Sequence, residues 1–182
     1  MKFTLSWLKD HLDTAATLKE ITEKLTLIGL EVEALADPSE TYAHFEVAEI
    51  TATAPHPEAD RLQICTVRSS GGDQQLVCGA PNARVGLIGI LAQEGAVIPG
   101  SGMVLGKAKI RGVESRGMMC SGAELGLNDD HDGIIELQAG ATIGSPAAEA
   151  LGLDDPMIEI AITPNRPDCL GVRGIARDLA AA

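Results

Sequence analysis

The sequence predicts a mostly β protein with α+β flanks, in which a small closed β-barrel is inserted into a discontinuous α+β domain. Three observations predict this class. Only four of the 182 residues are aromatic, whereas 20 are glycine and 9 are proline, which favours many short elements joined by tight turns. A helix and a strand open the chain, and a matching strand and helix close it. Short strand candidates separated by turn residues fill the space between.

The first predicted element is a helix over residues 18–28. Thr17 and Glu20 have the spacing of a capping box, and apolar residues then recur at helical spacing until Gly29. Residues 30–36 switch to a period of two, which is typical of a half-buried strand. The apolar face of this strand holds Leu30, Val32 and Ala34.

Two similar breaker segments enclose the middle of the chain. Residues 37–40 and 154–156 each combine acidic side chains with a proline, and we interpret them as hinges. Residues 157–163 repeat the alternating pattern of the first strand, so the two strands are expected to pair. The predicted domains are residues 1–38 with 152–182, and residues 41–150.

The inserted segment contains six strand candidates and two brief helical signals. The strands are residues 45–53, 62–68, 74–78, 87–91, 103–111 and 133–137. The helical signals are residues 121–127 and 145–151. Short strands at this spacing favour a small closed barrel.

The last part of the chain is predicted to turn and then form a helix. Two prolines in residues 164–168 exclude a helix there, and apolar residues from Val172 to Leu179 have helical spacing. The helix reaches the end of the sequence without a capping residue. We therefore expect the native polypeptide to continue.

Charge and composition exclude several classes of protein. Fourteen basic residues against 26 acidic ones give a net charge of −12, so binding of nucleic acid through bulk positive charge is excluded and any such contact must be local. No apolar stretch is long enough to span a bilayer, and no signal peptide opens the chain. No C-x-x-C pair is present, so the four cysteines are expected to be reduced core residues in a cytoplasmic compartment.

One basic cluster interrupts this acidity. Lys107, Lys109, Arg111 and Arg116 lie close together in sequence, and Glu114 is the only acid among them. In a strand the first three would share one face while Ala108 and Ile110 face the core. Such a stripe could follow a sugar-phosphate backbone. The alternative is a solvated edge strand protected by its lysines.

Other candidate sites are weaker. His56, followed by Pro57 and Glu58, could suggest a general base beside a carboxylate, but the prolines favour a turn between two strands. His131 lies between two aspartates without a second histidine at ligand spacing, which favours a polar loop over a metal site. Residues 102–108 lack the spacing and the hydroxyl residue of a phosphate-binding loop.

Several stretches together resemble the beta subunits of bacterial phenylalanine-tRNA ligase. The most diagnostic is Thr163-Pro-Asn-Arg-Pro-Asp168. The other matching stretches, in the same order as in that family, are residues 1–8, 56–62, 77–82, 110–118, 120–121, 124–127 and 131–134. The resemblance covers essentially the whole chain.

The resemblance implies that residues 41–150 form an OB-fold of the tRNA-binding type and that the flanks form one discontinuous domain. Residues 111–112 and 115–118 match the most widely shared motif of that module and coincide with the basic cluster. The expected tRNA-binding residues are therefore Lys107, Lys109, Arg111, Ser115 and Arg116. The segment from 41 to 151 carries 7 basic and 13 acidic residues, so autonomous affinity for tRNA is expected to be weak.

The resemblance also places catalysis outside this chain. ATP and Mg²⁺ serve the whole enzyme through the alpha subunit, and editing belongs to later parts of the beta subunit. No catalytic, cofactor-binding or metal-binding residue is therefore expected here. The implied partners are tRNA and the alpha subunit, in an assembly of two alpha and two beta subunits, without membrane or DNA. Two alternatives stay open: a subunit-assembly scaffold that does not touch tRNA, and a free-standing tRNA-binding module.

Overall fold

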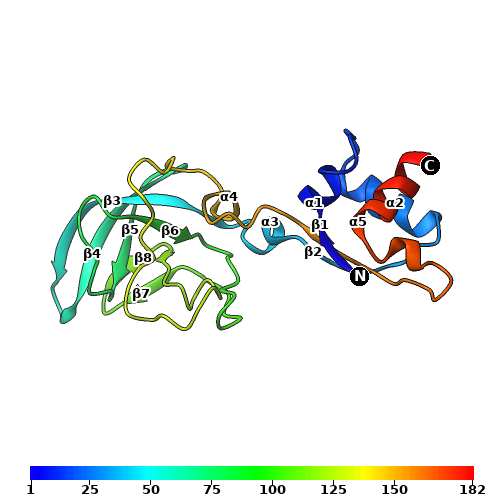
Figure 1. The fold of residues 1–182 in the computed structure, drawn as a ribbon. Helices are drawn as coiled ribbons and strands as arrows, with labels where there is room; N and C mark the ends of the chain where they lie inside the picture. The colour runs from blue at the N-terminus through cyan, green and yellow to red at the C-terminus, as the bar shows by residue number, and fades with distance from the viewer. The chain divides into compact units, whose positions relative to one another are not determined.

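The computed structural model describes residues 1–182 and separates into two compact units (Figure 1). Unit 1 consists of Met1–Pro38 and Leu153–Ala182, and unit 2 consists of Ser39–Gly152. Each unit buries its own apolar cluster, so each is described by itself.

Unit 1 is a three-stranded antiparallel sheet with helices. Its elements are β1 (Lys2–Thr4), α1 (Leu5–Lys9), α2 (Leu18–Leu27), β2 (Val32–Ala36), β10 (Met157–Ile160), a 3₁₀ turn (Pro167–Cys169) and α5 (Val172–Ala181). The strand order is β1-β10-β2, so the strand that follows the insertion lies at the centre.

The expected pairing of the two flanking strands is confirmed. Met157 lies opposite Ala36 and Ile158 opposite Leu35 in the antiparallel ladder between β10 and β2. The chain therefore leaves unit 1 at the end of one strand and returns beside that point. The capping box is also confirmed, because the Thr17 hydroxyl accepts the Glu20 amide while the Glu20 carboxylate accepts the Thr17 amide.

The structure differs from expectation at β2 and at the first hinge. The half-buried strand expected over residues 30–36 is wrong beyond Val32, since Ala34 is exposed and Leu35 is 47% exposed. β2 is an edge strand, with β10 on one side and no strand on the other. The first hinge contains a short helix, α3 (Pro38–Thr41), because proline is compatible with the first turn of a helix.

Unit 2 is built on a five-stranded antiparallel sheet. Its elements are β3 (Phe45–His56), β4 (Ala59–Ser69), β5 (Gly72–Cys78), β6 (Ile88–Ala92), β7 (Ala108–Ile110), β8 (Val113–Ser115), β9 (Met118–Met119) and α4 (Ala147–Ala150). The order in the large sheet is β5-β4-β3-β6-β9, and β7 pairs with β8. β3 pairs with β6 through its first half and with β4 mainly through its second half, and a bulge follows Ile50. This arrangement curls the sheet.

Hydrogen bonds connect the two outer strands of the curled sheet through the segment around β8. The Arg116 amide donates to the Gln75 carbonyl on β5 at 3.0 Å, and the Val77 amide donates to the Ser115 hydroxyl at 3.1 Å. β9 follows immediately and pairs with β6. A single stretch of chain therefore contacts both edges of the sheet.

Three expected elements of unit 2 are wrong, and a fourth is shorter than expected. Of the strand expected over residues 103–111, only 108–110 is strand. Residues 133–137 are irregular, although the Ile135 and Leu137 amides bond to carbonyls of Cys120 and Ile88. Residues 121–127 form successive turns, and the helix expected over 145–151 is confined to α4. Alternating apolar residues indicate an extended chain, but not whether a neighbouring strand is available to complete a ladder.

Candidate functional site

The basic cluster lies on the β7–β8 hairpin, which lies beside β5 (Figure 1). Its turn consists of Arg111 and Gly112, with φ angles of +45° and +86°. A two-residue turn with both φ angles positive matches the twist of a hairpin. Arg111 is the only non-glycine residue of the chain with a positive φ.

The four cations occupy different parts of this hairpin. Lys107 precedes β7, Lys109 is in β7, Arg111 is in the turn and Arg116 follows β8; all four are exposed. The expected stripe on one strand face is therefore wrong, because the strand is only three residues long. Ala108, expected to face the core, is exposed. The structure nevertheless keeps the four cations within one hairpin or directly next to its strands.

Carboxylates neutralise part of this charge. Lys107 Nζ lies 3.7 Å from Glu94, and Arg116 Nε lies 2.9 Å from Glu114. The hydrogen bond from Arg116 lowers the pKa of Glu114, and the charges of Lys107 and Lys109 lower it further. Lys109 and Arg111 are outside any ion pair, so they are the cations most available to an external anion.

Ser115 differs from the other predicted site residues because it is buried. Its exposed fraction is 4%. Its hydroxyl accepts the Val77 amide and donates to the Gly117 carbonyl at 3.4 Å. The side chain therefore joins β8 to β5 within the unit.

The segment around His56 is a turn, as expected. It joins β3 to β4, and its residues approach the basic hairpin. His56 Nε2 lies 3.1 Å from the Ile110 carbonyl, and Arg111 Nη1 lies 2.9 Å from the Glu58 carbonyl. These two contacts were not foreseen from the sequence, because the residues are more than 50 positions apart.

Aromatic side chains are absent from the surface of unit 2. Its two aromatic residues, Tyr42 and Phe45, are 8% and 3% exposed and contact each other edge to face. The Tyr42 hydroxyl is occupied by the Leu125 carbonyl. No Phe, Tyr or Trp ring is therefore exposed on this unit for stacking with a nucleic-acid base.

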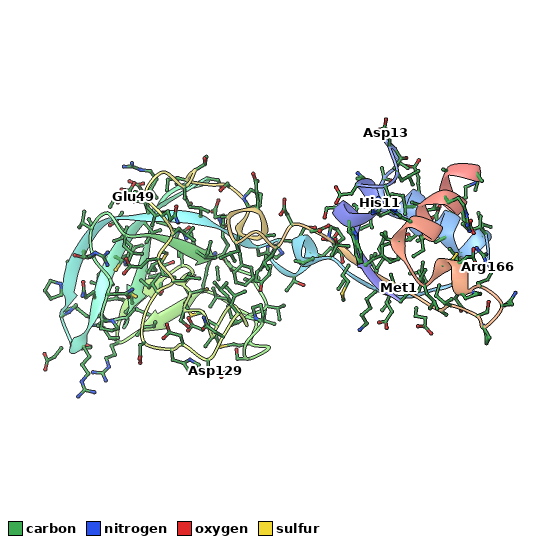
Figure 2. The ribbon with its side chains drawn as sticks, in the orientation of Figure 1. Met1, His11, Asp13, Glu49, Asp129 and Arg166 are labelled. Carbon is green, nitrogen blue, oxygen red and sulfur yellow. The ribbon has the colours of Figure 1, made fainter.

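A separate charged cluster lies in unit 1 around Arg166, which is labelled in Figure 2. The ligand atoms of Asp168, Cys169 and Asp178 lie within 4.8 Å of one another, the spacing of a metal site. The guanidinium of Arg166 contacts all three, and Arg177 contacts both aspartates. The negative charge that would attract a cation is thus neutralised, and the cluster connects the Pro167 turn to α5.

A hollow of about 310 Å³ in unit 2 is lined by several reactive side chains, including Cys78, Glu124 and His131. A hydrogen bond from the Cys65 thiol lowers the pKa of Cys78. The Glu124 carboxylate is occupied by the amide and hydroxyl of Ser121. These three side chains form no group with metal-ligand spacing, because only the Asp168 cluster has it. His131 itself is exposed and lies outside any helix or strand.

The segment that contains the hairpin matches a known protein family. Residues 45–146 match the family described as "Putative tRNA binding domain". The chain is 61% identical over 181 residues to the phenylalanine-tRNA ligase beta subunit of Rhodospirillum rubrum, and 59% identical over 189 residues to that of Nitrobacter winogradskyi. Both alignments cover 100% of this chain, which spans 22% and 23% of the relatives' lengths.

None of the helices combines the length and apolar character needed to cross a bilayer.

Proposed function

Because the chain belongs to the family of phenylalanine-tRNA ligase beta subunits and carries the family's tRNA-binding domain, we propose that unit 2 binds the phosphate backbone of tRNA through its β7–β8 hairpin. The main support is that four exposed cations are concentrated on this hairpin, within a unit that is otherwise acidic. Phosphate contacts from Lys and Arg supply affinity without reading sequence.

Unit 2 in this proposal is an OB-fold barrel of the tRNA-binding type. The support is the curled five-stranded sheet together with the segment that bonds to both of its edges. The Arg116 amide and the Ser115 hydroxyl provide the contacts to β5. Ser115 therefore acts by holding the hairpin strand in place, and the four cations contact the tRNA.

The cations differ in what binding requires of them. Lys109 and Arg111 meet a phosphate without first losing an ion pair, whereas Lys107 and Arg116 must exchange Glu94 and Glu114 for it. Exposed ion pairs of this kind contribute little to stability, so the exchange costs little. Because no exposed Phe, Tyr or Trp side chain accompanies the cations, binding depends on phosphate contacts and is sensitive to salt.

The chain serves a larger enzyme in this proposal. That enzyme attaches phenylalanine to its tRNA in the cytoplasm, in an assembly of two alpha and two beta subunits that uses ATP and Mg²⁺. No group of residues in this chain is assigned to ATP, Mg²⁺ or phenylalanine. The acidic surroundings of the hairpin repel the same backbone, so the rest of the enzyme anchors the tRNA.

Steady-state kinetics of the intact ligase test this proposal. The variant with Lys107→Glu, Lys109→Glu and Arg111→Glu is compared with the wild type at low salt. The proposal expects a raised Michaelis constant for tRNA, with unchanged constants for ATP and phenylalanine. An unchanged Michaelis constant for tRNA would contradict the proposal and indicate that the hairpin is a solvated edge that does not bind tRNA.

A second candidate function is subunit assembly, and exposed apolar side chains in unit 1 favour it. Leu27 is 80% exposed, and with Val32 and Leu35 it lines a shallow hollow of about 540 Å³. We propose that the alpha subunit covers this face. Replacing Leu27 and Leu35 with glutamate should then weaken the association of alpha and beta subunits in size-exclusion chromatography, while an intact assembly would reject this role.

A further inference from the structure

The turn between β3 and β4 is in contact with the tip of the basic hairpin, and His56 is the residue that joins them. Its side chain is 5% exposed. Nδ1 lies 3.1 Å from the Glu58 amide nitrogen, and Nε2 lies 3.1 Å from the Ile110 carbonyl oxygen. Both ring nitrogens are therefore occupied.

These partners define the state of the ring. A backbone amide can only donate, so Nδ1 of His56 accepts from Glu58 and carries no proton. The proton of the neutral ring is then on Nε2, which donates to the Ile110 carbonyl. The ring thus connects its own turn to the last residue of β7.

A second bond connects the same two segments in the opposite direction. Arg111 Nη1 donates to the Glu58 carbonyl at 2.9 Å. Arg111 makes this bond from a left-handed backbone conformation, which is unfavourable for a residue with a side chain. The guanidinium keeps its other N–H groups for an external anion.

The hairpin needs such contacts because β7 has no other strand beside it. It pairs only with β8, and only β8 is bonded to β5. An isolated two-stranded hairpin is marginally stable in water. Without the His56 bond, the last residue of β7 would lose its contact with the β3–β4 turn, and Arg111 would be the remaining hydrogen bond between that turn and the hairpin.

We propose that His56 is a positioning residue, which holds the β7–β8 hairpin against the β3–β4 turn in the orientation that presents Lys109 and Arg111 to the tRNA backbone. This inference rests on the proposed function. It assigns no chemistry to the imidazole. The ring acts by fixing where the cations lie.

Two variants of His56 and one control separate positioning from general stability. His56→Leu removes both bonds, whereas His56→Gln keeps an amide that can donate to the Ile110 carbonyl. The control is Asn82→Ala, because Asn82 bonds to Ile134 and Glu136 within the same unit and away from the hairpin. Hydrogen exchange of residues 107–113, the salt dependence of tRNA binding and the thermal midpoint are measured in the intact protein.

In His56→Leu we expect the amides of the hairpin to exchange faster, on the order of tenfold, which corresponds to the loss of one buried hydrogen bond. We also expect a smaller slope of log Kd for tRNA against log salt. His56→Gln should restore both in part. Asn82→Ala should lower the thermal midpoint and leave the hairpin exchange and the slope unchanged.

Wild-type hairpin exchange in His56→Leu would overturn the inference, and so would loosened exchange with an unchanged salt slope. The variant Lys109→Ala is measured alongside, so that failure of the positioning role can be distinguished from failure of the proposed function. If Lys109→Ala reduces the slope while His56→Leu does not, tRNA binding by the hairpin stands and the positioning role falls.

Discussion

Arg166 and Arg177 connect Asp168 in the 3₁₀ turn with Asp178 in α5, and this network affects the stability of the fold in acid. Hydrogen bonds from Arg166 and then Arg177 hold the pKa of Asp168 well below its usual value. Arg177 and then Arg166 lower the pKa of Asp178. Because both carboxyls have a lower pKa folded than unfolded, their contribution is present above the unfolded value of about 4 and is lost as the pH falls further.

Thermal unfolding between pH 6 and pH 2 tests this network. The melting temperature of unit 1 should decrease as the pH is lowered past about 4, and this decrease should be smaller in Asp168→Asn. Asp13→Asn, an exposed aspartate of the same unit, is the matched control. Equal acid sensitivity in all three proteins would show that the network does not stabilise the fold.

The Ser115 hydroxyl provides a second test at the level of one residue. Ser115→Ala leaves the half-buried Val77 amide without an acceptor, so we expect a loss of about 1–2 kcal/mol in the free energy of urea unfolding. The affinity of the folded variant for tRNA should stay close to that of the wild type. Weaker tRNA binding with unchanged stability would instead make Ser115 a direct contact.

The sequence could predict which residues carry charge, but not how that charge is used. The cluster of Lys107, Lys109, Arg111 and Arg116 is visible because cations are rare in this chain. The pairing of Lys107 with Glu94, and the approach of His56 to Ile110, depend on how distant segments fold together. Spacing along the chain carries no information about such contacts.

At the scale of elements, the irregular segment over residues 133–137 lies directly over β6. A Cβ atom at Gly89 would lie 2.7 Å from the Ile135 carbonyl oxygen and 2.9 Å from Ile134 Cγ2. The segment approaches this closely because position 89 has no side chain.

Gly89→Ala tests this packing. It should lower the free energy of unfolding by about 1–3 kcal/mol, because the backbone of the neighbouring segment must move. Gly106→Ala is the control, since a Cβ there would meet nothing within 4 Å. Equal stability of the two variants, measured by urea unfolding, would refute the close packing.

The elements that sequence patterns predicted best are those with a long local signal. The capped helix α2 and the strands β3, β4 and β5 each present several turns or alternations of apolar residues. β8 and β9 have three and two residues, which is too short for any period to appear. Their positions are set by hydrogen bonds to β5 and β6, which only the folded chain supplies.

At the scale of the whole molecule, the negative charge of the chain opposes tRNA binding everywhere except at the hairpin. The net charge of the chain is −12, yet one hairpin presents four cations. A local positive site on an acidic protein limits non-specific binding of nucleic acids, since the remaining surface repels them. We therefore expect the affinity for tRNA to depend on a few defined phosphate contacts.

The salt dependence of tRNA binding by the intact protein tests this claim most directly. Each cation that contacts a phosphate releases counterions, so Lys109→Ala should reduce the slope of log Kd against log salt by about 1 and weaken binding to all tRNAs similarly. Arg84→Gln, which removes a cation paired with Glu136 outside the hairpin, should leave the slope unchanged. A wild-type slope in Lys109→Ala would contradict phosphate binding by the hairpin.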